Sequence, residues 1–437
     1  MSKNVPDLTK IGAISSPQNM EISTSIIEPI QQNDTFARFV LMNRGILHSN
    51  SKLQLAIVKP GKDSFLAMGV GSHGLIQRCV LKAGTKTISE TDDWNHLQGY
   101  HSMFVSNEAK VEREGVLTGR CGHYGYTDDN LVRIENFQEF DSGNNQSMNA
   151  YQNLEQQPTW QITLSELFPF LKQIQLPLYC MKDQLSIEIH FADQTNRSWY
   201  KKGETGGDFS IDQVQTKMIV DYIHYDQDSM DTYQQQIETK GFQIPIFDNV
   251  LVKNSIETAK LATGYTRNLG CANRMVNKII IANTNEGFGT ATFGNVYNSQ
   301  WNTPVDHGDY LVNLKYNDLS LFPRDLSNRA HVFSLLTAAE SVPPFVLKEE
   351  YDGSRATEVT TNTFEGYNLR TEGFVNAAKA YITLVLNKGD RINGRGVDLS
   401  LTMKHMPAGL TQIIQRVWCE TAKVISLKDG RLSCVYA

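Results

Sequence analysis

The clearest alternation of hydrophobic and polar positions in the chain covers residues 185–191. Its apolar positions are Leu185, Ile187, Ile189 and Phe191, and a polar residue separates each from the next. This period of two predicts a β-strand with one buried face and one solvent-exposed face. Residues 397–403 repeat the alternation and predict a second strand of the same kind.

Shorter strand-like segments fill much of the remaining chain, and clusters of Gly, Asn, Ser and Pro separate them. They cover residues 21–30, 36–42, 53–58, 75–81 and 215–224, and a further one begins at 244–246. Asn393-Gly394 and Asp429-Gly430 are two-residue hairpin turn signals. This spacing of short strands and turns predicts an all-β protein built from β-sandwiches.

Helical patterns are few, and we expect them only in connections, at residues 94–104, 164–174 and 324–339. The second has a clear start, because Thr163 and Glu166 have the spacing of a capping box. Pro169 and Pro177 follow closely, so this helix is expected to be short.

At 437 residues the chain predicts two domains of roughly 200 residues each. We place the boundary in the acidic, glutamine-rich stretch after residue 225, where apolar residues are sparse. The predicted division is an N-terminal arm at 1–20, a first jelly-roll domain at 21–228, a linker at 229–245 and a second jelly-roll domain at 246–437. A polar segment at 106–158 without periodicity is expected to be a long surface loop of the first domain.

A faint internal repeat favours two related halves. Residues 75–81 and 275–281 both read apolar pair, amide, base and apolar triplet.

Composition excludes several classes of protein. The formal net charge of −6 argues against direct, sequence-specific nucleic-acid binding, which needs clustered Lys and Arg. The six cysteines are scattered without a C-x-x-C pair, so we expect buried, reduced thiols. No apolar run near the N-terminus is typical of a signal peptide, and none approaches a membrane span, so synthesis and assembly inside a cell are expected.

Motif-like groups of residues are present, but each has a simpler interpretation. Gly69–Gly74 fits G-x-G-x-x-G, yet strand-like residues follow where a dinucleotide site needs a helix. A zinc site could be assembled from four residues at non-standard spacing, and a calcium loop from three aspartates without its glycine and closing glutamate. These two sets are His96, His101, Cys121 and His123, and Asp226, Asp228 and Asp231.

Catalytic signatures such as G-x-S-x-G, H-E-x-x-H and the P-loop do not occur in the sequence. A glycosidase-like carboxylate pair would meet only in the fold, and therefore stays open. Aromatic residues could stack on sugars, although in β-sandwiches they more often belong to the core or an interface. The main ones are Trp199, Tyr200, Tyr222, Tyr225, Trp301 and Trp418.

The order of several segments resembles the double jelly-roll major capsid proteins of double-stranded DNA viruses, most closely the polinton-like virus and virophage branch. A short apolar helix, an L-P-L step and a strand occur in order over 167–191. The other matching segments are Asp92-Asp93-Trp94-Asn95 with Tyr100, Val220-Asp221-Tyr222-Ile223, Asn317-Asp318 with 321–326, Arg391-Ile392-Asn393-Gly394, and Val417-Trp418.

This resemblance implies two tandem eight-stranded jelly rolls in a structural protein that forms pseudo-hexameric homotrimeric capsomers of an icosahedral shell. It also implies neighbouring capsomers, penton and minor capsid proteins as partners, and location in the virion. It implies no enzymatic activity, and no catalytic, cofactor-binding or metal-binding residues. The alternative from a different class is a carbohydrate-binding or carbohydrate-active β-sandwich protein.

Overall fold

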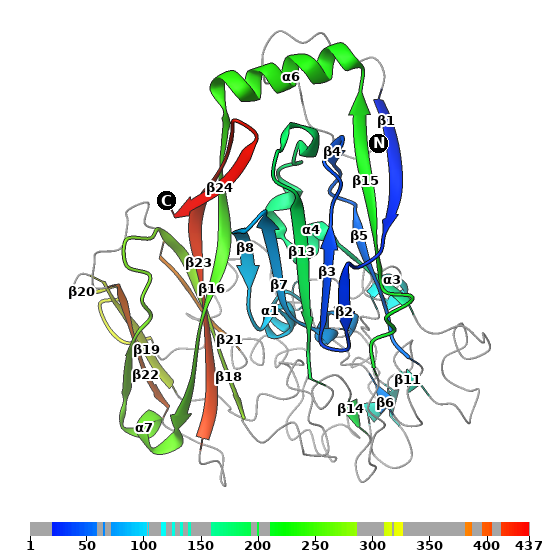
Figure 1. Ribbon diagram of the computed structural model, residues 1–437. Coiled ribbons are helices and arrows are strands. Elements are labelled where there is room, and N and C mark those ends of the chain that lie inside the picture. Colours follow the sequence, from blue (N-terminus) through cyan, green and yellow to red (C-terminus); the bar gives the residue numbers. More distant parts are fainter. Residues whose placement is uncertain are drawn as a thin grey trace.

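The computed structural model is an all-β structure of two β-sandwiches that lie side by side (Figure 1). It describes residues 20–58, 64–65, 71–102, 104, 115–118, 125–126, 132–133, 139–140, 159–193, 199–200, 210–285, 310–316, 319–326, 381–386, 396–403 and 412–436. The predicted N-terminal arm, except its last residue Met20, and most of the predicted 106–158 loop lie outside the described residues.

The first sandwich has two antiparallel sheets. In one sheet the order is β1 (Met20–Ile27), β15 (Lys217–Tyr225), β5 (Lys52–Ala56) and β12 (Thr159–Thr163), and the short β4 (Ile46–Leu47) also pairs with β15. In the other sheet the order is β2 (Gln31–Asn33), β3 (Phe36–Val40), β13 (Leu185–Phe191), β7 (Ile76–Ala83) and β8 (Lys86–Thr91).

The second sandwich also has two antiparallel sheets. One runs β16 (Phe242–Glu257), β23 (Gln412–Lys428), β18 (Val276–Asn285) and β21 (Tyr381–Val385), and β24 (Arg431–Tyr436) extends it by pairing with β23. The other runs β17 (Tyr265–Asn268), β22 (Val397–Met403), β19 (Tyr310–Tyr316) and β20 (Leu319–Ser320).

The two sandwiches have the same topology. Within the described residues, and without the short β2 and β4 and the terminal β24, each sandwich contains eight principal strands. We number these strands 1 to 8 in chain order within each sandwich. In both sandwiches, one sheet then has the strand order 1-8-3-6 and the other has the order 2-7-4-5. This is the double-sheet jelly roll with its two Greek-key connections. The predicted fold class, two tandem eight-stranded jelly rolls, is confirmed.

Small paired segments complete the described strands. The first group is β6 (Ser64–Phe65), β11 (Glu139–Phe140) and β14 (Trp199–Tyr200), and the second is β9 (Gly125–Tyr126) with β10 (Val132–Arg133).

The seven-residue repeat is not the trace of the duplicated topology. Residues 75–81 fall largely on β7, the fourth principal strand of the first sandwich, whereas residues 275–281 fall largely on β18, the third of the second. The two segments therefore occupy non-equivalent positions. The predicted relation between the two halves is confirmed by their shared strand order, although these two segments do not occupy equivalent strands.

Strand β13 lies in the centre of its sheet, between β3 and β7. Its apolar face belongs to the first core as predicted, with Ile187 and Ile189 fully buried. The opposite face was predicted to be solvent-exposed, but Ser186 and Glu188 are buried too. The reason is that long side chains from β3 and β7 cover this face: Arg38 lies 3.8 Å from Glu188, and Lys82 pairs with Glu188 at 2.6 Å.

The described helices are short and lie between strands. They are α1 (Trp94–Ser102), α3 (Gly115–Thr118), α4 (Leu164–Leu167), α6 (Gln227–Lys240) and α7 (Thr258–Thr263), with 3-10 turns at Gly71–Leu75, Pro169–Lys172 and Leu178–Cys180. The predicted capping box is present, because the Thr163 amide donates to Glu166 Oε2 at 3.0 Å. Within the described residues, no helix is both long and apolar enough to cross a membrane.

Helix α6 occupies most of the stretch predicted as the linker and connects β15 to β16. Asp226 caps its first turn by accepting a hydrogen bond from the Ser229 amide at 3.1 Å. Tyr233 and Ile237, four residues apart, are buried against the first core, and Gly241 ends the helix at a φ of 67°. The helix lies across one end of the molecule between β15 and β16 (Figure 1).

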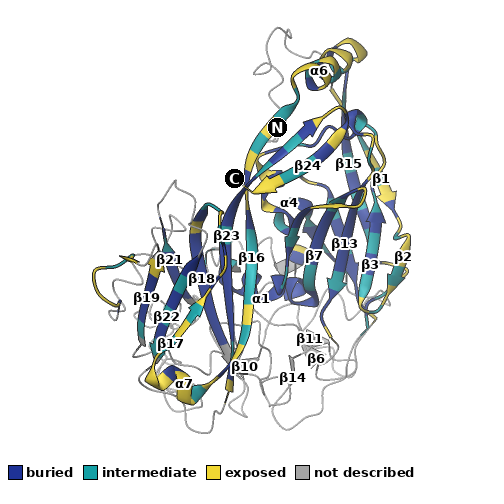
Figure 2. Cartoon of the chain, turned by 60° about the vertical axis from the view of Figure 1, so that its left-hand side comes forward, coloured by how far each residue is buried: buried dark blue, intermediate teal, exposed yellow. Residues whose placement is uncertain are grey.

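The first core extends beyond the first sandwich. Its buried cluster includes Ile246, Ile425, Leu427 and Leu432 from β16, β23 and β24. The other parts of β16 and β23 belong to the second core, to which Ile256 and Val417 contribute. Figure 2 shows buried residues along β7, β13 and β23, and exposed ones on β1 and α6. Two long strands therefore join both cores.

Candidate functional site at the junction of the two jelly rolls

Charged and aromatic side chains gather where the first sandwich meets the second. Here β8 and the start of α1 face β16, β23 and β24 (Figure 1). We call this region the junction. It is defined by two buried ion pairs, an aromatic contact and one pocket, and each is described below.

The first ion pair centres on Asp93, in the turn that leads into α1. Its Oδ2 accepts hydrogen bonds from Arg416 Nε at 2.6 Å and Lys253 Nζ at 2.8 Å, both from the second sandwich. The Asp93 and Arg416 side chains are only 7% and 6% exposed. Burial on its own would raise the pKa of Asp93, but His96, Arg416 and Lys253 together lower it well below its ordinary value. Asp93 is therefore ionised at neutral pH.

The second ion pair joins Asp248 on β16 to Lys423 on β23 at 2.5 Å. Asp248 Oδ1 also accepts a hydrogen bond from Ser89 Oγ on β8, at 3.1 Å, so this carboxylate links the two sandwiches. Burial would lower the pKa of Lys423, but the neighbouring Asp248 raises it above its ordinary value. The lysine therefore stays charged and paired.

An aromatic contact fills the space beside the Asp93 pair. Leu97 and Tyr100 on α1 form one buried cluster with Ile280 and Trp418 of the second sandwich. The Trp418 indole N–H donates to the Asp92 carbonyl at 3.3 Å, and Thr383 Oγ1 donates to the Tyr100 hydroxyl at 3.3 Å. Burying two large aromatic side chains across this contact contributes several kcal/mol, on the order of 2–3 each.

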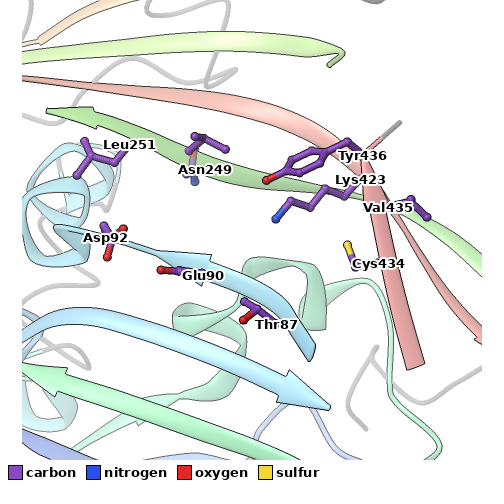
Figure 3. A pocket seen from close by; sticks show the side chains of 10 residues that line it. Thr87, Glu90, Asp92, Asn249, Leu251, Lys423, Cys434, Val435 and Tyr436 are labelled. Atoms are coloured by element: carbon purple, nitrogen blue, oxygen red, sulfur yellow. The ribbon is translucent and has the colours of Figure 1, made fainter. Parts of the chain in front are cut away.

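A pocket of about 310 Å³ lies at the junction (Figure 3). Glu90 and Asp92 line it from the first sandwich, and Lys423 and Tyr436 line it from the second. Arg78 pairs with both Glu90 and Asp92, with Nε 2.9 Å from Asp92 Oδ1. Burial raises the pKa of Asp92, and the Arg78 charge only partly offsets it.

The chemistry available in this pocket is limited. Cys434 lines it, but burial raises the pKa of its thiol, which makes it a poor nucleophile. Glu90, Asp92 and Lys423 all have opposite charges as partners. Across the described part of the chain, no group of three or more His, Cys, Asp or Glu residues is arranged to hold a metal ion.

Only two of the four residues considered for a zinc site lie in the described part of the chain. His96 and His101 lie on α1, and His96 is beside Asp93. Cys121 and His123 lie outside the described residues. The glycine motif ends in a buried 3-10 turn that leads directly into β7, so the strand-like residues predicted after the motif do form a strand. His73 in this turn stacks on Trp94, with ring centroids 5.2 Å apart.

The calcium-like aspartates belong to α6 and not to a metal-binding loop. Asp226 is the N-terminal cap, and Gln227 Nε2 donates to Asp231 at 2.7 Å on the helix surface. The aromatic residues considered for sugar stacking include three that are buried, Tyr222, Tyr225 and Trp418. Trp301 and the side chains of Trp199 and Tyr200 lie outside the described part.

Sequence reasoning identified one part of the junction and missed the others. Residues 92–95 were singled out as a family-like segment, and the structure places them at the junction. Arg416, Asp248 and Lys423 were not singled out. Each lies in a long strand that mixes apolar with polar and charged residues, and that pattern also fits an exposed strand face.

Solved structures of viral capsid proteins share this fold over almost their whole length. The Sputnik virophage structure matches with a TM-score of 0.59 and 10% identity, covering 97% of this chain and 90% of that one. The PBCV-1 virus capsid structure matches with a TM-score of 0.57 and 12% identity, covering 98% and 99%. The mavirus major capsid protein matches with a TM-score of 0.55 and 9% identity, covering 99% and 94%.

No protein-family model and no curated relative matches the sequence. At 9–12% identity the structural matches establish the fold. Two of the family-like segments take the expected place, because 220–223 lie in β15, the last strand of the first jelly roll, and 417–418 lie in β23. Residues 317–318 and 391–394 lie outside the described part. The resemblance is confirmed: the chain has the double jelly-roll fold of the major capsid proteins of virophages, PBCV-1 and other double-stranded DNA viruses.

Proposed function

We propose that this chain is the major capsid protein of an icosahedral double-stranded DNA virus, and that three copies form a capsomer of pseudo-hexagonal outline. The observation that carries the proposal is the identical strand order in the two sandwiches. Each copy offers two near-equivalent lobes, so three copies around a threefold axis offer six. The near-complete coverage of viral capsid structures supports the same assignment.

The junction supports this role because a shell needs lobes held at a fixed angle. Asp93 and Asp248 each join the first sandwich to the second, and each is buried. Breaking such a contact leaves a charge or a polar group unpaired, so relative motion of the lobes is costly. In this proposal the junction is a rigid joint between two building blocks, and the protein has no enzymatic activity.

Strand β1 supplies a surface for contact between copies. It is an edge strand, paired on one side with β15. Met20, Ile22 and Ile26 are 46%, 47% and 67% exposed and alternate along the strand, so they share its outer face. Exposed apolar stripes on edge strands mark interaction sites. We place part of the contact between copies there.

The remaining parts of the proposal follow from the same assignment. They are location in the virion shell, contacts with neighbouring capsomers and with penton and minor capsid proteins, and no direct sequence-specific contact with the genome. The division into domains at 21–228 and 246–437 is kept as a proposal. The buried aromatic residues give no support to the carbohydrate-binding alternative.

The test is the mass and shape of the purified full-length protein. Light scattering after size exclusion should give three times the chain mass of 49.2 kDa, and negative-stain images should show particles with a six-lobed outline. Ile22→Lys with Ile26→Lys should shift the protein to monomers without loss of β-structure, because charges would then face the neighbouring copy. Val214→Lys, at a 73% exposed position in a turn outside the strands, is the matched control. A strictly monomeric wild-type protein at micromolar concentration would sink the proposal.

A further inference from the structure

Two edge strands carry exposed apolar side chains on opposite sides of the molecule. On the first jelly roll, Met20, Ile22 and Ile26 share the outer face of β1, and we call them the β1 stripe. On the second jelly roll, Leu319 of β20 is 73% exposed. Figure 1 shows β1 and β20 far apart, at opposite sides. A closed ring of three copies needs two different surfaces of this kind, because each copy turns one toward each neighbour.

The junction within one chain shows which strands fit together. There β8 packs against β16, and the turn after β8 places Asp93 on Arg416 of β23. In the numbering of principal strands, β8 is the fifth strand of the first jelly roll, and β16 and β23 are the first and eighth of the second. The corresponding strands outside the junction are β20, the fifth of the second jelly roll, and β1 and β15, the first and eighth of the first. The exposed apolar side chains lie on this second set of strands.

The turn after β20 is held firmly on its own sheet. The Leu321 amide donates to the Leu314 carbonyl of β19 at 2.7 Å. Leu326, buried in the second core, exchanges backbone hydrogen bonds with Val312 of β19 at 2.9 and 3.1 Å. Arg324 lies between these two anchors and is exposed. Its positive charge is therefore presented on a fixed turn, next to Leu319.

The outer face of β1 and β15 carries the opposite charge. Thr24 belongs to the same face as the β1 stripe and is paired with Asp221 of β15 in the sheet. Its hydroxyl donates to Asp221 Oδ1 at 2.6 Å. Asp221 is only partly buried, whereas its neighbours Val220 and Tyr222 belong to the first core. Because side chains alternate along a strand, the Asp221 carboxylate lies on the outer face beside the stripe.

We propose that neighbouring copies meet by repeating the junction between chains, so that Leu319 and the turn at 321–325 of one copy dock on the outer face of β1 and β15 of the next. Leu319 covers the β1 stripe, and Arg324 pairs with Asp221. The charges are reversed relative to the junction, where the turn carries the acid, Asp93, and the eighth strand carries the base. Opposite charges fix the register of such a contact and disfavour wrong pairings. This inference rests on the proposed trimer and names the second surface of its contact.

The first test is cross-linking of the full chain that carries both Ile22→Cys and Leu319→Cys. A short bis-maleimide should join copies into two-chain and three-chain species on a denaturing gel, and mass spectrometry should find peptides with positions 22 and 319 linked. Because β1 and β20 lie on opposite sides of one copy, this link forms only between chains. The wild-type chain, with its six native cysteines, and the two single variants give the background.

The second test measures assembly by light scattering after size exclusion. Leu319→Lys should raise the concentration at which half of the protein is trimeric by at least about tenfold, since it places a charge against the β1 stripe. Val214→Lys, at an equally exposed position (73%), is the matched control and should leave that concentration unchanged. Arg324→Glu should also weaken the trimer, and Asp221→Lys in the same chain should restore it.

The possible results separate this inference from the proposed function. A wild-type protein that stays monomeric overturns both. The inference alone is overturned by a trimer in which positions 22 and 319 never link between chains, in which Leu319→Lys assembles as well as Val214→Lys, or in which Asp221→Lys restores nothing. If a charge variant loses its β-structure in circular dichroism, the peptide map of the cross-linked double-cysteine protein decides.

Discussion

Asp93→Asn is the most direct perturbation of the junction. Asparagine has nearly the same shape and tolerates the left-handed conformation, so it suits the φ of 46° at this position. The substitution therefore removes the carboxylate charge and leaves the turn intact. Arg416, whose side chain is 6% exposed, then loses its buried partner, whereas Lys253 at 43% exposure can turn to water.

The expected cost follows from this difference in exposure. Removing one partner of a buried ion pair lowers the free energy of unfolding by about 3–5 kcal/mol. Because Lys253 can turn to water, only Arg416 is left buried without the carboxylate, so we expect Asp93→Asn to cost about 3 kcal/mol. Denaturant unfolding followed by tryptophan fluorescence measures the change. The matched control is Glu257→Gln, because its partner Lys260 lies 3.3 Å away and both side chains are more than half exposed. This control should cost about 0.5 kcal/mol or less.

The pH dependence gives a second readout of the same carboxylate. The folded-state pKa of Asp93 lies below the value of 3.8 for an unperturbed aspartate. Its contribution to stability is therefore complete above the unfolded pKa and declines as pH falls toward the folded pKa. The difference in unfolding free energy between the wild-type protein and Asp93→Asn should be constant near neutral pH and should shrink in strong acid. A cost equal to that of the Glu257 control, or a gap that grows in acid, would refute the reasoning.

Three further predictions concern other regions. Thr163→Ala should cost about 1 kcal/mol in denaturant unfolding because it removes the capping hydroxyl of α4, whereas Thr232→Ala on the exposed surface of α6 should be nearly neutral; equal costs would contradict the capping role. Deleting residues 1–18 should lower assembly yield and leave the circular dichroism unchanged, and lost β signal would show that this arm belongs to the core. A short insertion after Gly143 should leave the protein soluble and folded, since surface loops accept extra residues at little cost, and insoluble protein would count against a surface loop there.

Local patterns predicted the strands well. The alternations at 185–191 and 397–403 coincide with the bounds of β13 and β22, because inward side chains of a sandwich repeat every second residue. The same pattern could not show that the outer face of β13 is covered. That depends on side chains of β3 and β7, which are distant in sequence.

Helix α6 was not among the predicted helices. Its segment is acidic and rich in glutamine, and the two apolar residues Tyr233 and Ile237, at helical spacing, pack it against the first core. The signal that could have found it is Asp226 as a cap with Gly241 as a stop. Junction contacts give less local signal still, because Asp93 and Arg416 are 323 residues apart and no periodicity links them.

The two long strands that join both cores also set the order in which the protein can fold. Ile425, Leu427 and Leu432 complete the first core, yet they are synthesised after every strand of the first sandwich. The N-terminal jelly roll therefore emerges from the ribosome with part of its apolar surface uncovered, and it stays so until β23 and β24 arrive. Such late, long-range closure makes folding slow. It also leaves the nascent first half in need of protection from aggregation until β23 and β24 have been made.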